Sequence, residues 1–277
     1  MNYDANCNRC NRLNDFLSVS KKKYPDYFCK PVPAFGDKNI KLLIVGLAPG
    51  LHGANKTGRP FTGDHAGIIL YETLFKHGLS NKPNSKERGD GLALYNCRIT
   101  NAVKCLPPLN KPTTLEIKNC NQFLKCEIEL LKPKTILLAL GTIAHNAILS
   151  SLRLTKKNFS FSHAARHELP NDLILYDSYH CSRYNTQTKR LTTEMFNDVF
   201  LSIKKEMEES LKEKKEYLAD KMTVMSEYAL VVKLCDRLDN IWSLAGMDNT
   251  FKYRQLKDTK YILDHLYKNR TFLTRTH

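Results

Sequence analysis

The sequence contains no apolar run long enough to cross a membrane. A spanning helix needs about 20 apolar residues, and the longest apolar runs, within Lys41–Leu47 and Thr135–Leu140, are far shorter. Met1–Asp4 has no basic group followed by an apolar stretch, so no signal peptide is readable. We therefore expect a cytoplasmic protein that does not associate with membranes.

Acidic side chains are few as well. The chain has 28 Asp and Glu against 43 Lys and Arg, which gives a net charge of +15. Residues 1–204 carry +13 of this charge and residues 205–277 carry only +2. Such an excess indicates a polyanionic partner, although charge alone does not separate DNA, RNA and anionic lipid. Length and charge together predict a domain at 1–204 and an appendage at 205–277.

From residue 40 onward, short apolar runs alternate with longer helical patterns, which is typical of a parallel sheet between helices. The expected strands are Ile40–Val45, Tyr95–Val103, Lys134–Leu140 and Leu173–Asp177. The expected helices between them are Gly67–His77, Thr114–Leu131 and Thr142–Ser151. The predicted fold is a three-layer α/β/α arrangement with a mostly parallel four-stranded sheet. Ligands in such folds bind beyond the carboxyl ends of the strands, so we expect the site in the loops there.

The segment after Leu191 has helical spacing throughout. Its candidate stretches are Glu206–Tyr217, Thr223–Ala245 and Asp258–Tyr267. Apolar residues in the second stretch recur at helical intervals and end at Trp242, the only tryptophan. This spacing predicts a helical appendage that packs on the first domain.

Nine cysteines without an export signal argue against a disulfide framework. Cys7 and Cys10 form a CxxC pair, and 14 residues separate Cys105 from Cys120. The loose second pair fits a zinc ribbon poorly, whereas a four-thiolate iron–sulfur cluster tolerates irregular spacing. Spacing alone leaves a cluster, zinc and no metal open. We interpret four others as buried small hydrophobic residues: Cys29, Cys97, Cys126 and Cys235.

Several longer motifs resemble those of one known family, the iron–sulfur uracil-DNA glycosylases. The matching segments, in chain order, are Gly46–Gly50, Thr57–Asp64, Asn101–Pro108 and His180 with Asn185–Thr192. The resemblance runs from Cys7 to about Phe200 and is greatest to the broad-specificity type B branch (family five). It implies a uracil-DNA glycosylase-like fold and a structural four-iron–four-sulfur cluster. The implied cluster ligands are Cys7, Cys10, Cys105 and Cys120.

The resemblance also implies a catalytic set of Asp64, His180 and Asn101. The target nucleotide must leave the duplex stack; Phe61 would then stack on the base, and Asn101 would read the polar edge of a pyrimidine. His180 would donate a hydrogen bond to the departing base. Asp64 would stabilise the cationic sugar or orient a water.

Further positions are implied to bind substrate and DNA. The pocket would be formed by Gly46, Leu47, Ala48, Pro49 and Gly50, with Phe61 and Asn185. The loop Ser182–Arg190 would probe the DNA groove, and its Ser182, Arg183 and Arg190 would contact DNA.

Two positions depart from the family pattern, and a third distinguishes its branches. Leu47 stands where the narrow-specificity branch has an acidic residue, which indicates a wider range of bases. Cys181 stands where proline is usual, which would free the loop backbone and place a reactive thiol near DNA. Lys189 stands where glycine is usual.

The C-terminal segment resembles a second family over a short stretch. Ala229–Asn240 is similar to the last metal-binding helix of HD-type phosphohydrolases of the RelA/SpoT kind, in which Asp236 would be a ligand. The upstream ligands of that family have no counterpart in the sequence. The resemblance therefore implies a truncated HD-domain-like appendage without a catalytic metal.

The implied function is hydrolysis of the N-glycosidic bond of uracil in DNA, which initiates base excision repair. Hypoxanthine and xanthine, in single- or double-stranded DNA, are expected as further substrates. We expect the enzyme to be a monomer and, in a bacterium, to be associated with the nucleoid. The alternative is a catalytically impaired nucleic-acid-binding protein that keeps the fold. An electron carrier would not need Phe61, Asn101 and His180 in these motifs.

Overall fold

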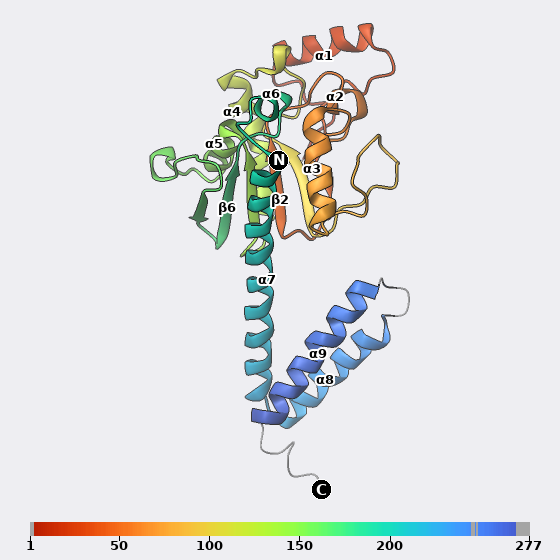
Figure 1. Ribbon diagram of the computed structural model, residues 1–277, viewed down its shortest axis with the longest axis vertical. Helices are drawn as coiled ribbons and strands as arrows, with labels where there is room; N and C mark the ends of the chain where they lie inside the picture. Colours follow the sequence, from red (N-terminus) through yellow and green to blue (C-terminus); the bar gives the residue numbers. More distant parts are fainter. Residues whose placement is uncertain (1–2, 245–246, 248, 270–277) are drawn as a thin grey trace. The chain divides into compact units, whose positions relative to one another are not determined.

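The computed structural model describes residues 3–244, 247 and 249–269 (Figure 1). The chain forms two compact units, residues 1–205 and residues 206–277. Within the described ranges, no helix combines the length and the apolar character that a membrane crossing requires.

A six-stranded sheet forms the centre of the first unit, in the order β1-β3-β2-β4-β6-β5. Its four inner strands pair in parallel; they are β2 (Leu42–Gly46), β3 (Cys97–Asn101), β4 (Ile136–Leu140) and β6 (Leu173–Ser178). The helices between them are α3 (His65–Lys76), α4 (Thr114–Glu129) and α5 (Thr142–Ser151). The predicted α/β fold is confirmed.

The predicted number of strands was wrong, because two antiparallel edge strands complete the sheet. β1 (Phe35–Gly36) pairs with β3, and β5 (Arg166–Leu169) pairs with β6. β1 has two residues, too few to show an alternation, and β5 has polar or charged side chains at three of its four positions. Neither strand produces the apolar run by which a strand is recognised in a sequence.

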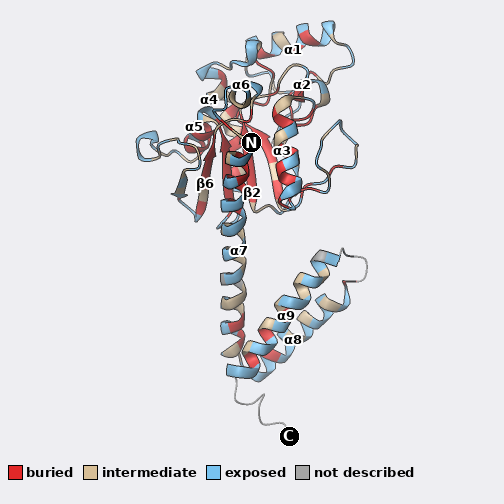
Figure 2. Cartoon of the chain, viewed as in Figure 1, coloured by how far each residue is buried: buried red, intermediate tan, exposed pale blue. Residues whose placement is uncertain are grey.

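Helices cover both faces of the sheet (Figure 1). On one face, Leu43 and Leu137 belong to a core that α4 and α5 complete. On the other, α3 lies beside the first turns of α7 (Thr193–Thr223), since His77 hydrogen-bonds Asn197 at 3.3 Å and stacks on Phe200. The inner strands are therefore buried on both faces, as Figure 2 shows, and the two central ones, β2 and β4, are apolar along their whole length.

Three further helices lie outside these layers: α1 (Asn11–Lys23), α2 (Ala54–Thr57) and α6 (Arg183–Gln187). The last corrects the expectation that Ser182–Arg190 is a loop. Ser182 caps α6, because its Oγ accepts a hydrogen bond from the Asn185 backbone N–H at 3.3 Å. A polar five-residue helix has no apolar periodicity, so the sequence pattern does not reveal it.

The second unit contains the remainder of α7 together with α8 (Glu227–Trp242) and α9 (Asn249–Asn269). Its small core comprises Ala219, Met222, Leu230, Ile262 and Leu266. Trp242 is 87% exposed and Cys235 is also exposed, so the expectation that both are packed was wrong. The reason is that a different face of α8, which carries Leu230, packs into the core. Asp236 is at the surface, 3.0 Å from Lys233.

Candidate active site

A cavity of about 570 Å³ opens where the inner parallel strands end. Parallel strands bring their carboxyl ends to one edge of the sheet, and the loops that follow them supply the walls. The lining residues are Leu47, Ala48, Gly50, Asp64, His65, Ala66, Asn110, Leu140, Gly141, Thr142, Ile143, His180, Ser182 and Arg183.

Seven residues predicted from the sequence line this cavity: Leu47, Ala48, Gly50, Asp64, His180, Ser182 and Arg183. The other predicted positions, Gly46, Pro49, Phe61, Asn101, Asn185 and Arg190, lie outside the lining. Sequence reasoning missed His65 and Ala66, although both follow Asp64 directly. It also missed the Leu140–Ile143 wall, although Gly141 ends a predicted strand and marks a loop at the expected edge.

Gly46, Asn101 and Phe61 pack against one another next to the cavity. Gly46 ends β2 directly opposite Asn101 at the end of β3. A β-carbon on Gly46 would lie 2.5 Å from Asn101 Oδ1 and 2.6 Å from the Phe61 ring, so only glycine permits this approach. Asn101 Oδ1 is buried and has no hydrogen-bond partner among the described residues.

Phe61 has an unusual backbone and a covered ring. Its φ of 54° lies in the left-handed region, which costs a non-glycine residue free energy and often marks a functional site. The residue is only 6% exposed, and its ring stacks on His180 with 5.9 Å between centroids and 24° between planes. A base that stacks on this face of Phe61 therefore requires the His180 ring to move.

His180 is a neutral imidazole in this setting. Burial lowers its pKa to about 4, and its Nδ1 lacks a hydrogen-bond partner within the described part of the chain. A neutral ring offers one N–H donor and one acceptor at pH 7. Asn185 positions this residue, because its Nδ2 donates to the His180 carbonyl at 2.8 Å.

Asp64 both caps a helix and faces the cavity. Its Oδ1 accepts a hydrogen bond from the Gly67 N–H at 2.9 Å, which caps α3. Its Oδ2 lies toward Gly53, where a β-carbon would come within 2.6 Å of it. Burial raises the pKa of Asp64, and the Gly67 hydrogen bond opposes that shift. The half-buried carboxyl group remains open to the cavity.

The loop after β6 corrects one expectation about Cys181. Its side chain is fully buried, Sγ donates to the Ala66 carbonyl at 3.4 Å, and burial raises the pKa of the thiol. A reactive thiol near DNA is therefore excluded at this position. Lys189 has a φ of 56°, so it adopts the backbone conformation that glycine favours.

Cys7, Cys10, Cys105 and Cys120 line a separate small cavity. Cys120 Sγ accepts the Lys104 backbone N–H at 3.2 Å, and Cys10 Sγ accepts from Asn119 Nδ2 at 3.7 Å. Sulfurs around one zinc ion lie about 3.8 Å apart. In the described residues, however, no three of these sulfurs come within 4.8 Å of one another. Four thiols around one small cavity, two of them accepting N–H hydrogen bonds, are a donor set that a four-thiolate iron–sulfur group also uses.

Residues 33–204 match the family model of the uracil DNA glycosylase superfamily. The chain belongs to this superfamily. It is 48% identical over 179 residues to the type-5 uracil-DNA glycosylase of Thermus thermophilus, covering 65% of this chain and 81% of that protein. Type-5 enzymes of Pyrobaculum aerophilum and Mycobacterium leprae are 42% and 39% identical over 199 and 211 residues. These matches cover 70% and 72% of this chain, and 86% and 90% of those proteins.

The superfamily match confirms the resemblance seen in the motifs. It includes the loops that surround the cavity, from Gly46 to Arg190, and ends before the second unit. Cys7 and Cys10 precede the matched range, so the family model does not test the cysteine group.

Gly46 and Gly50 offer a matched test of the packing in this superfamily site. We expect Gly46→Ala to lower the free energy of unfolding by about 1–3 kcal/mol, since the new methyl group overlaps Asn101 and Phe61. Gly50→Ala should change it by less than about 1 kcal/mol, because the nearest atom is 3.8 Å away. Denaturant unfolding measures both values. Equal effects of the two substitutions would contradict the close packing at Gly46.

Proposed function

We propose that this chain hydrolyses the N-glycosidic bond of uracil in DNA and so initiates base excision repair. The observation that carries the proposal is a pair of buried, unpaired polar atoms within the described structure, Asn101 Oδ1 and His180 Nδ1, whose residues both lie next to the Phe61 ring. Such atoms are costly unless a ligand satisfies them. The N–H and carbonyl groups of a pyrimidine edge supply suitable partners. The type-5 relatives, named as uracil-DNA glycosylases, support this choice.

Different residues stabilise the two charges that develop on the base and on the sugar during the reaction. As the glycosidic bond breaks, the base gains negative charge, and the neutral His180 donates a hydrogen bond to its oxygen. The sugar gains positive charge. The carboxylate of Asp64, on the cavity wall, either stabilises this charge or orients the attacking water. Asn101 holds the base edge while Phe61 stacks on the ring.

The cavity wall favours a range of bases. Leu47 and Ile143 make it apolar at two places, and neither carries a charged group that would reject a purine. Hypoxanthine and xanthine are therefore further proposed substrates, processed by a monomeric enzyme. The range of accepted bases can be measured as base release from duplexes that each contain one deaminated base.

Asp64→Asn separates charge from helix capping. Asparagine caps a helix as well as aspartate does, so the free energy of unfolding should stay within about 1 kcal/mol of the original. Uracil release should nevertheless fall by about 100- to 10,000-fold, because the carboxylate charge is lost. The measurement is single-turnover release from a uracil-containing duplex.

The control for that comparison is Asp198→Asn, which removes an exposed carboxylate from α7. It should keep the original rate. An undiminished rate in Asp64→Asn would remove Asp64 from the mechanism.

We also propose a four-iron–four-sulfur cluster on Cys7, Cys10, Cys105 and Cys120. The four thiols that share one small cavity and the N–H groups directed at Cys10 and Cys120 support it. When bound, the cluster supplies structural cross-links between the N-terminal segment, the loop after β3 and α4. The cysteines hold it, and Lys104 orients Cys120 through its backbone N–H.

Iron content distinguishes this cysteine group from the others. Cys120→Ala should abolish the brown colour and bring the iron content well below the roughly four atoms per chain expected for the intact cluster. Cys97→Ala, at a buried cysteine outside the cavity, should retain both. Iron and sulfide analysis with visible absorption makes the comparison. Zinc instead of iron in the original protein would refute the cluster.

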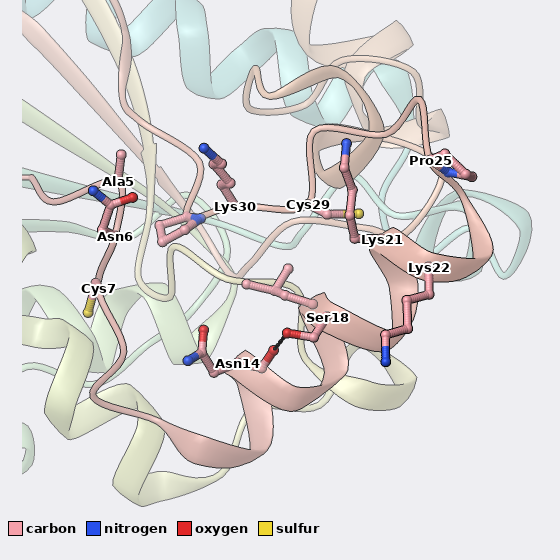
Figure 3. A pocket seen from close by; sticks show the side chains of 12 residues that line it. Ala5, Asn6, Cys7, Asn14, Ser18, Lys21, Lys22, Pro25, Cys29 and Lys30 are labelled. Carbon is pink, nitrogen blue, oxygen red and sulfur yellow. Dashed lines mark hydrogen bonds between the residues drawn. The ribbon is translucent and has the colours of Figure 1, made fainter.

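A basic cavity provides a path for the DNA backbone. It has a volume of about 650 Å³ and lies between α1 and residues 25–31. Lys21, Lys22 and Lys30 stand around it (Figure 3), and Lys21 is held by the Tyr27 carbonyl at 2.6 Å. We assign this surface to DNA phosphates, in agreement with the +13 charge of residues 1–204.

The salt dependence of DNA binding tests this assignment. Replacing Lys22 and Lys30 together by Gln should reduce the slope of log K against log salt by about 1.8, or about 0.9 per phosphate contact. Lys38 and Lys132 are exposed at the amino ends of the strands, on the edge opposite the active-site cavity. Replacing that pair removes the same charge and should leave the slope nearly unchanged. Equal slopes for the two double variants would contradict a specific path.

A further inference from the structure

Three side chains with metal-ligating atoms meet inside the first unit, and none of them lines any of the three cavities described above. His145 is on α5, His167 on β5 and Asp177 near the end of β6. One ligand atom from each lies within 4.8 Å of the other two, and they form the one such group in the described residues. None of the three lines the active-site cavity. The uracil chemistry proposed above does not use them.

The strand pairing explains why these residues meet. β5 and β6 are antiparallel with His167 opposite Leu175, so Asp177 is its diagonal neighbour on the same face of the sheet. Leu175 belongs to the core that α5 covers, and residues two apart in a strand share a face. Asp177 therefore points toward α5, where His145 meets it. Because backbone pairing sets the geometry, the group is preformed.

The hydrogen bonds of His145 are typical of a metal ligand. Its Nε2 lies 3.0 Å from the Phe159 carbonyl, and its Nδ1 lies 2.8 Å from Asp177 Oδ1. Both neighbours are acceptors, so without a metal both ring nitrogens must carry protons. A ligating histidine usually donates its second N–H to a backbone carbonyl, which fixes the ring. The Phe159 carbonyl accepts the Nε2–H of His145 in this way, so Nδ1 is the nitrogen that can bind an ion.

Asp177 completes the donor set. Its side chain is fully buried, and its Oδ2 lies 3.1 Å from His167 Nε2. Without a metal, protonated His145 is the cation that compensates this buried carboxylate, and a divalent ion would take the place of that proton. His167 is 14% exposed, which gives an ion and a water a route to the group.

We propose that His145, His167 and Asp177 bind a divalent transition-metal ion, with zinc as the preferred occupant. Two imidazoles and one carboxylate are ligands that zinc accepts in a tetrahedral site, with water in the fourth position. The ion links α5, β5 and β6 three residues before His180. It thereby fixes the strand end that carries the catalytic histidine.

Zinc titration of the full chain, purified and treated with a chelator, tests the site. Isothermal titration calorimetry should show one zinc ion bound per chain. The affinity should fall at least about 100-fold in His145→Asn and in His167→Gln. His163→Gln replaces a nearby histidine outside the group and should retain the original affinity. Retained affinity in both ligand variants, or no binding by the original protein, overturns the proposal.

Two further measurements keep the result clear. Cobalt(II) bound to nitrogen and oxygen lacks the intense thiolate charge-transfer absorption, so its spectrum separates this site from the cysteine group. Zinc should raise the Tm of the original protein and of His163→Gln, but not that of His167→Gln. A thiolate spectrum for the bound cobalt, or an equal Tm shift in all three proteins, also overturns the proposal. None of these readouts depends on uracil release.

Discussion

The approach of the Gly46 backbone to Asn101 and Phe61 is the contact on which the site depends. Parallel pairing places Gly46 opposite Asn101, so the ends of β2 and β3 fix the amide beside the first loop. Only a residue without a β-carbon leaves room there for both Asn101 and the Phe61 ring. Phe61 in turn adopts a left-handed backbone and stacks on His180. One tight contact thus places the three groups that we propose meet a base.

The site stores free energy that a ligand can release. Asn101 Oδ1 and His180 Nδ1 are buried without partners within the described residues, and Phe61 holds a strained φ. Burial also lowers the pKa of His180 to about 4 and raises that of Asp64. These costs are tolerated because the surrounding sheet is rigid and buried on both faces. A polar base edge relieves the unpaired atoms, which favours binding of the extruded nucleotide over an empty pocket.

The sequence predicted the parts of the fold that have strong local signals. The central strands β2 and β4 are continuous apolar runs, and Thr113 with Glu116 forms the capping box that marks the start of α4. The edge strands and α6 lack such signals, since β5 is polar and α6 has five residues. Trp242 has helical spacing, but spacing does not say which face of a helix becomes buried. Motif order identified Asp64 and His180, whereas the Leu140–Ile143 wall depends on strand order, which the sequence does not show.

The central claim is that the unpaired atoms around Phe61 receive a uracil base and that its glycosidic bond is then cut. Mass spectrometry of the products from a uracil-containing duplex, incubated with the purified chain, tests this most directly. The account predicts free uracil together with an otherwise intact strand that carries one abasic site. Tight binding of the same duplex with no free uracil would contradict the account and identify a nucleic-acid-binding protein that has kept the fold without the reaction.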